Sequence, residues 1–121
     1  MVGANPLEHL SYIPDNYLNG SGRTHINIPD NVKYINDSAF FNSSLETVVI
    51  PNTIETLGLG IFEHSPRLKS VDMSSTNYVE VTYAMCKNCS SLVEFKLPSS
   101  CKHISASAFW NCHRLEKIEI D

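Results

Sequence analysis

The C-terminal half of the chain contains residues that could bind a metal ion or exchange a disulfide. Cys86 and Cys89 are separated by two residues, and Cys101, Cys112 and His113 follow them. Two thiolates at this spacing chelate zinc well, and a later cysteine and histidine could complete a tetrahedral site. The same thiols could also form a redox pair. One hypothesis is therefore a zinc or redox protein that uses this cysteine cluster.

Histidine-based catalysis has less support in the sequence. His64, His103 and His113 are candidate acids or bases, but no nucleophile occurs in a recognisable elbow motif and no pair of acidic residues recurs around them. The segment LGLGIF at 57–62 lacks the later glycine and the lysine of the nucleotide-binding fingerprints. We therefore expect no catalytic residues, no enzyme activity and no cofactor.

The composition limits the classes of partner. A chain of 121 residues is long enough for one domain with a hydrophobic core. Nine Lys and Arg against 13 Asp and Glu give a net charge of -4, and the basic residues are scattered, so nucleic acid is not expected as a partner. No apolar run approaches the roughly 20 residues of a membrane-spanning helix, so membrane insertion is not expected either.

The N-terminal residues bear on localisation. The segment MVGANPLEHLSYIPDN has neither the basic region nor the uninterrupted apolar region of a signal peptide. We therefore expect a cytoplasmic protein. If the chain is a fragment of a larger precursor, an extracellular surface location is the alternative.

An internal repeat is the strongest signal in the sequence. The segments 28–50, 50–73, 73–97 and 97–120 align, and their starts are 22 to 24 residues apart. They begin with Ile28, Ile50, Met73 and Leu97, and each ends with the pattern Leu-x-x-apolar-x-apolar. A spacing of this size is typical of leucine-rich repeats.

Two further sets of residues recur inside each repeat. One is a pair of apolar residues: Val32 and Ile35, Ile54 and Leu57, Val79 and Val81, and Cys101 and Ile104. The other is a small or apolar residue followed by a bulky one: Ala39–Phe40, Ile61–Phe62, Ala108–Phe109 and, in the third copy, Met85–Cys86. The alternation in LETVVI and LEKIEI has a period of two, which predicts one short strand per repeat with one buried face.

The repeat offers a different explanation of the cysteines. Cys89 and Cys112 occupy the same repeat position, three residues before the repeat leucine, and Ser65 holds that position in the second copy. Cys86 and Cys101 occupy positions that Phe and Val hold elsewhere. Because small thiols pack well in an apolar interior, we expect reduced, buried cysteines, with Cys89 and Cys112 in adjacent coils. A metal site and a disulfide are the less favoured alternatives.

The repeat also predicts the organisation of the chain. Residues 1–22 are expected to form an N-terminal cap and a degenerate half-repeat, with a short helical turn around Leu7 and Leu10. Residues 23–121 are expected to form about four full coils of a single domain. Because the sequence ends directly after Ile118 and Ile120, the last apolar face, including Phe109 and Leu115, is expected to be partly open.

The repeat resembles the BspA-like class of leucine-rich repeats, whose pattern is IPxxVxxIxxxAFxxCxxLxxIxI. The copy at 97–120 fits every marked position except that Leu97 replaces the first Ile and Cys101 replaces Val, and the resemblance covers about residues 13–121. The third copy departs most, because it lacks Pro after Met73 and has an extra residue. The resemblance implies a right-handed leucine-rich-repeat solenoid of the α/β repeat type, with short strands and short helical or turn segments, and a binding role. Members occur on microbial cell surfaces and in viruses with large genomes.

Several outward positions are candidates for partner binding. Phe41 and Trp110 follow the bulky core residue, where an aromatic ring has no structural need, although they could instead cover the rim of the core. Large aromatic residues on a rigid surface dominate binding energy at interfaces. The outward strand positions complete the predicted partner-binding set: Thr47, Val49, Asp72, Glu94, Lys96, Lys117 and Glu119.

These observations leave three functional hypotheses. The first is a non-catalytic protein–protein interaction module, such as a small intracellular inhibitor or adaptor, that covers or bridges a partner protein. The second is a fragment of a microbial cell-surface adhesin, and the third is the zinc or redox protein. A homodimer through the uncapped C-terminal coil is a further expectation.

Overall fold

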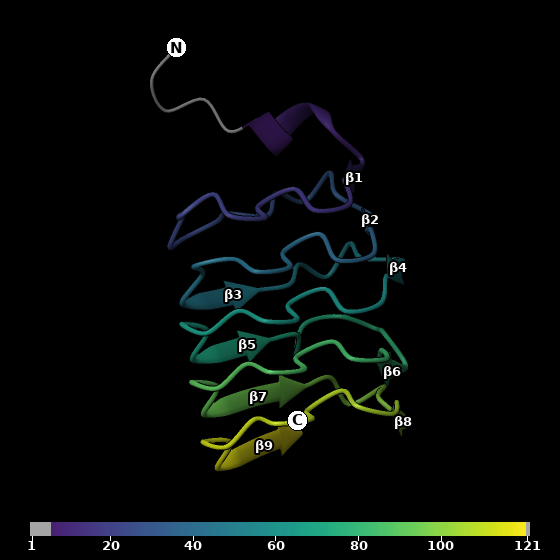
Figure 1. Cartoon of the computed structure of the whole chain (residues 1–121). Helices are drawn as coiled ribbons and strands as arrows, with labels where there is room; N and C mark the ends of the chain where they lie inside the picture. Colours follow the sequence, from purple (N-terminus) through teal and green to yellow (C-terminus); the bar gives the residue numbers. More distant parts are fainter. Residues whose placement is uncertain (1–5, 121) are drawn as a thin grey trace.

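The computed structural model describes residues 6–120 and consists almost entirely of short parallel strands joined by turns (Figure 1). The elements are the 3-10 helix Pro6–His9 and the strands β1 Tyr12–Ile13, β2 Tyr34–Ile35, β3 Thr47–Val49, β4 Thr56–Leu57, β5 Ser70–Asp72, β6 Glu80–Val81, β7 Glu94–Leu97, β8 His103–Ile104 and β9 Lys117–Ile120. The longest sheet has the order β3-β5-β7-β9, and two smaller sheets have the orders β1-β2-β4 and β6-β8.

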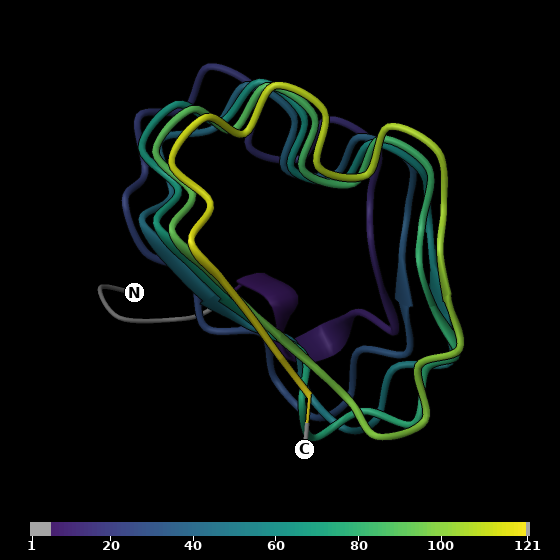
Figure 2. The ribbon, with the colours of Figure 1, turned by 90° about the horizontal axis from the view of Figure 1, so that it is seen from below.

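Each repeat forms one turn of a solenoid. Parallel pairing places Val48 beside Val71, Val71 beside Phe95, and Phe95 beside Ile118, so equivalent residues of successive repeats stack directly. Viewed along the stack, the successive coils follow nearly the same path (Figure 2). The predicted single-domain leucine-rich-repeat solenoid is confirmed, and the structure has about five turns.

Turns, rather than α-helices, connect the strands in the part of the chain that the structure describes. Two residues in each coil, four positions apart, have a positive φ. The first column has φ values of 55° to 60° and comprises Asn16, Ser38, Gly60, Ala84 and Ser107. The second has φ values of 52° to 69° and comprises Gly20, Asn42, His64, Asn88 and Asn111. Because a left-handed residue every four positions interrupts an α-helix, the expected helical or turn segments are turns.

Hydrogen bonds in these turns alternate between the coil itself and its neighbour. The amide of Phe41 donates within its own turn to Ser38 O at 3.0 Å, whereas the amide of Phe40 donates to Ile61 O of the next coil at 2.9 Å. The turns are therefore part of the inter-coil ladder, and each coil depends on the next to satisfy its backbone groups.

The apolar residues of the repeat fill the interior. Phe40 and Phe62 are fully buried, and their rings stack with centroids 5.6 Å apart. Phe40, Phe62 and Phe109 hold the bulky position of the repeat, and the first two are enclosed in the core. Phe109 is only partly buried and meets Phe95 edge-on at 5.0 Å, since no coil packs on its outer side in the described residues.

The third repeat contains one wrong prediction. The sequence aligned Val79 with Val32 and Ile54, which are buried, but Val79 is 53% exposed. Tyr78 packs against the core in its place, together with Val81. The extra residue of this repeat shifts the chain, so the inward pair is spaced i, i+3, as it is for Val32 and Ile35. At this point the small sheet is interrupted between β4 and β6, and the amide of Leu57 donates to the hydroxyl of Tyr78 at 3.2 Å.

The N-terminal end of the core is covered by the 3-10 helix. Leu7 is fully buried and Leu10 packs against the core. The side chain of Asn31 donates hydrogen bonds to the carbonyls of Leu7 and Leu10, which fastens this segment to the first coil. The two ends of the solenoid therefore differ, because no comparable segment covers the last described coil.

Candidate binding surface

The β3-β5-β7-β9 sheet has one face in the core and one face exposed, and the predicted strand residues all lie on the exposed face. One outward column contains Thr47, Ser70, Glu94 and Lys117, and the other contains Val49, Asp72, Lys96 and Glu119. Neighbours within a column are about 4.8 Å apart, the spacing of paired strands. The strands thus bring together seven of the nine residues that were predicted from sequence.

Charge is unevenly distributed over this exposed sheet face. At the β3 edge, Thr47 is exposed and Val49 is 62% exposed, so this end is uncharged. At the β9 edge, Lys117 Nζ is 2.7 Å from Glu119 Oε1 and 3.8 Å from Glu94 Oε2. The hydrogen bond between the two side chains raises the pKa of Lys117 and lowers the pKa of Glu119, because it stabilises the charged form of each group.

Two clefts adjoin the exposed sheet face. The larger has a volume of about 610 Å³ and is lined by Lys69, Ser70, Val93, Glu94, Glu116 and Lys117. The smaller, at the end of β3, has a volume of about 330 Å³ and its lining includes Val49 and Pro51. Clefts of this kind can accept side chains of a partner that lies across the sheet.

The two predicted aromatic residues lie outside this face. Trp110 is 57% exposed, and Lys87 Nζ lies 5.3 Å from its ring centroid. Phe41, which was expected to be substantially exposed, is instead half-buried and packs edge-on against His64 at 5.4 Å. They belong to a turn row in which Glu63 lies between Phe41 and Lys87, so the structure does not bring the two rings together.

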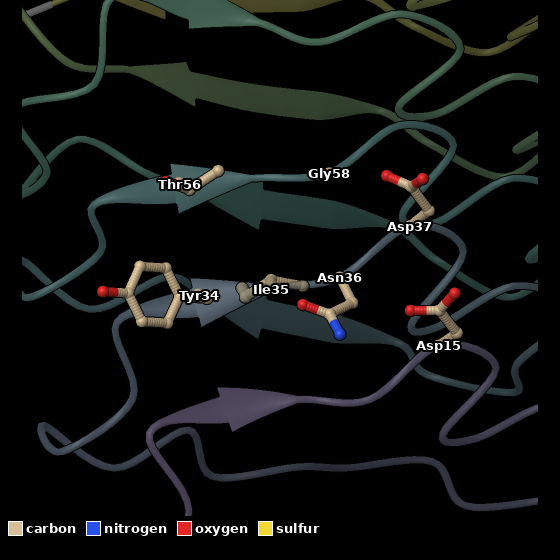
Figure 3. Close-up of a pocket in the computed structure, with 7 residues that line it drawn as sticks. All are labelled: Asp15, Tyr34, Ile35, Asn36, Asp37, Thr56 and Gly58. Atoms are coloured by element: carbon tan, nitrogen blue, oxygen red, sulfur yellow. The ribbon is translucent and has the colours of Figure 1, made fainter.

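The sequence reasoning missed an aromatic pair on the β1-β2-β4 sheet. Tyr12 and Tyr34 are 42% and 39% exposed and are directly paired in register. Figure 3 shows Tyr34 beside a shallow pocket of about 280 Å³, with Asp15 and Asp37 at its other end in consecutive coils. A signal was present, because each tyrosine directly precedes a core isoleucine and the period of two places it outward.

The cysteines form part of the core and its rim. Cys86 and Cys89 are fully buried, whereas Cys112, expected to be buried, is only half-buried because it lies in the last coil. Cys101 is also partly exposed, and all four thiols are free. Cys89 Sγ donates to Phe62 O at 3.0 Å and Cys112 Sγ donates to Cys86 O at 3.0 Å.

The environment of Cys86 and Cys112 opposes thiolate chemistry. Burial raises the pKa of Cys86, and burial together with the nearby Cys89 raises the pKa of Cys112 to about 11. The thiolate is the form that binds metals and attacks disulfides. Among residues 6–120, no group of three or more His, Cys, Asp or Glu side chains is placed to hold a metal ion. The described residues also include no helix of the length and apolarity needed to cross a membrane.

Two solved structures share the fold. A leucine-rich repeat protein from Eubacterium ventriosum is 18% identical with a TM-score of 0.80, and the match covers 90% of this chain and 30% of that protein. A leucine rich cell surface protein from Faecalibacterium prausnitzii is 23% identical with a TM-score of 0.61, and the match covers 83% of this chain and 32% of that protein. The chain therefore spans about a third of the length of either. No curated protein matches the chain in sequence.

The sequence match agrees with the fold. Residues 11–121 match the BspA type leucine rich repeat region in six copies, which covers the coils described above from β1 onward. Each copy in the sequence corresponds to one coil in the structure. Successive coils repeat the same stacking positions and the same two left-handed turn residues. The chain therefore belongs to the BspA type leucine rich repeat family.

Proposed function

We propose that the protein is a non-catalytic interaction module that binds a partner protein on the exposed face of the β3-β5-β7-β9 sheet. The observation that carries this proposal is the register of that sheet, which holds two columns of outward side chains beside a cleft of about 610 Å³. A surface of this extent can cover or bridge a partner without a conformational change.

The construction of the sheet suits recognition. The central strands β5 and β7 are hydrogen-bonded on both sides, so their outward side chains keep their positions before binding. Preorganisation of this kind lowers the entropy lost on association. Val49 supplies an apolar contact at one edge of the face. The outward charged side chains of β5, β7 and β9 select a partner of complementary charge. Trp110 provides an additional contact for a partner that extends around the last coil.

Two biological settings fit this module. In the first, the 121-residue chain works in the cytoplasm as a small inhibitor or adaptor. In the second, it is part of a longer cell-surface adhesin, which is favoured by its likeness to a protein described as a leucine rich cell surface protein. The binding face is the same in both settings, and the identity of the captured partner separates them.

Paired surface variants test the proposed face. The face variant carries Val49→Asp and Glu94→Lys, and the control carries Val79→Asp and Glu55→Lys, which change exposed residues of the same types on the other side of the coil. A partner is captured with the unaltered chain, identified by mass spectrometry and titrated against each purified variant. We expect the face variant to bind at least about tenfold more weakly and the control to bind normally.

The control also defines failure. Equal weakening in both variants, or normal binding by the face variant, would show that the partner uses another surface. Circular dichroism of each variant confirms that the comparison is made between folded proteins.

A further inference from the structure

The outer surface of the last coil exposes residues whose counterparts one coil earlier are buried. Ile104, Ile118 and Ile120 are 45%, 46% and 60% exposed. Their partners one coil earlier, Val81, Phe95 and Leu97, are 0%, 0% and 6% exposed. Phe109 and Leu115 complete this surface, and both are only partly buried. The C-terminal end face is thus an apolar surface with the composition of a core.

The backbone of this end face is also directed outward. In earlier coils the amide at the end of the strand donates to the following coil: Ile50 N to Asp72 O at 2.8 Å, and Met73 N to Lys96 O at 3.0 Å. Ile120 occupies the same repeat position on β9, which is the edge of its sheet. Its amide therefore points beyond β9, and the edge can pair with another strand.

The charges on β9 are complementary to those of a second β9. Lys117 and Glu119 flank Ile118 on the exposed side of the strand. If two copies of β9 pair antiparallel about Ile118, each Lys117 lies opposite Glu119 of the second copy. Directly opposed residues in such a pair are about 5 Å apart, within reach of an ion pair between long side chains. A two-fold axis through Ile118 thus pairs both strand edges and places opposite charges of the two copies beside each other.

The opposite end of the molecule favours this closed arrangement over a chain of stacked molecules. The 3-10 helix covers the N-terminal end of the core, with Leu7 buried and Asn31 bonded to its carbonyls. A head-to-tail contact would bring the apolar C-terminal end face against this cap. An end-to-end contact instead buries like surface against like surface, as a two-fold interface requires.

We propose that the occupant of the C-terminal end face is a second copy of this chain, with the two β9 strands antiparallel and centred on Ile118. The proposal uses the end of the stack, and the only residues that it shares with the binding face described above are Lys117 and Glu119 of β9. Val49 lies at the opposite edge of the sheet, so Val49→Asp disrupts partner binding without altering self-association.

Charge exchange at two exposed positions tests the register. Sedimentation velocity is measured on the 121-residue chain from about 1 to 200 µM, because dimer formation follows mass action. We expect a two-fold increase in mass with concentration. Lys117→Glu and Glu119→Lys, tested singly, place like charges opposite each other and weaken the dimer by about tenfold or more. The double variant Lys117→Glu/Glu119→Lys restores opposite charges across the axis and recovers the dimer.

Mixing the two single variants separates the interface from effects on the monomer. Each single variant places like charges at positions 117 and 119 of one molecule, where the unaltered side chains lie 2.7 Å apart, whereas the mixed dimer places two carboxylates of one copy opposite two amines of the other. We therefore expect the mixture to recover the dimer, while a purely intramolecular effect would persist in it. Lys33→Glu is the matched control, since Lys33 is 52% exposed against 57% for Lys117 and pairs with Glu55 on the other side of the coil. A chain that remains monomeric throughout, or a dimer that ignores the charge exchange, overturns the proposal. If only a further coil of the same type can cover the end face, the chain would remain monomeric at every concentration.

Discussion

At the scale of single residues, the cysteine positions prove to be hydrogen-bonding positions as well as packing positions. Ser65 Oγ donates to Phe40 O at 3.1 Å, and Cys89 Sγ donates to Phe62 O at 3.0 Å in the next coil. Either Ser or Cys is found at this repeat position because the position requires a small side chain that can donate a hydrogen bond. This need was not evident from the sequence, which shows the pattern but not the carbonyl that it serves.

Substitution of Cys89 measures this hydrogen bond. Cys89→Ser keeps a donor and copies Ser65, so we expect its free energy of unfolding to stay within about 1 kcal/mol of the unaltered protein. Cys89→Ala leaves the buried carbonyl of Phe62 without this donor and should cost about 1–3 kcal/mol. Urea denaturation of both variants gives the two values. If alanine and serine were equivalent, the position would serve packing alone.

At the scale of the element, the turn between coils is determined by where two backbones touch. A Cβ atom on Gly58 would lie 2.5 Å from Asp37 N and 2.6 Å from Asn36 C of the preceding coil. These are backbone atoms held in the inter-coil ladder, and they cannot move aside as a flexible side chain could. Gly58 is therefore required by close approach rather than by its own φ.

Gly58→Ala should accordingly destabilise the protein severely, by about 3 kcal/mol or more, because it forces adjacent coils apart. The comparison is Gly22→Ala, where φ is +75° but no atom lies within 4 Å of the new Cβ. That variant carries only the cost of a left-handed alanine, about 1–2 kcal/mol. Thermal unfolding measures the loss of stability in each variant. A larger loss in Gly22→Ala than in Gly58→Ala would show that the backbone φ angle, and not the close approach of two coils, is the stronger requirement for glycine.

Elements could be predicted where the repeat is regular and not where it is interrupted. The period of two in LETVVI and LEKIEI correctly indicated β3 and β9 with their outward side chains. The same reasoning failed at Val79, because an extra residue changes which side chain faces inward without changing the local apolar pattern. Left-handed turns at Ser38 and Ala84 were also invisible, since neither residue type signals a positive φ.

At the scale of the whole molecule, burial depends on the neighbouring coil as much as on the repeat position. Phe62 and Phe109 hold the same position, yet only Phe62 is fully buried, because it lies between two coils. The sequence identifies the position and therefore predicts the core row. How far a given member is buried follows from where its coil lies in the stack (Figure 1).

This dependence gives the last prediction. Phe62→Ala removes a fully buried ring that stacks on Phe40, and should cost about 3–5 kcal/mol at every protein concentration. In the monomer Phe109→Ala should cost less, about 1–2 kcal/mol, since this ring contacts a coil on one side only.

If the C-terminal end face is buried against a second copy, the unaltered protein melts at a higher temperature as its concentration rises, because association stabilises the folded form. Phe109→Ala should reduce that concentration dependence, whereas Trp110→Ala, which alters an exposed ring in the same coil, should leave it intact. Calorimetry over a roughly hundredfold range of concentration, about 2 to 200 µM, distinguishes these cases. A melting temperature independent of concentration in all three proteins would place Phe109 at the rim of a monomer.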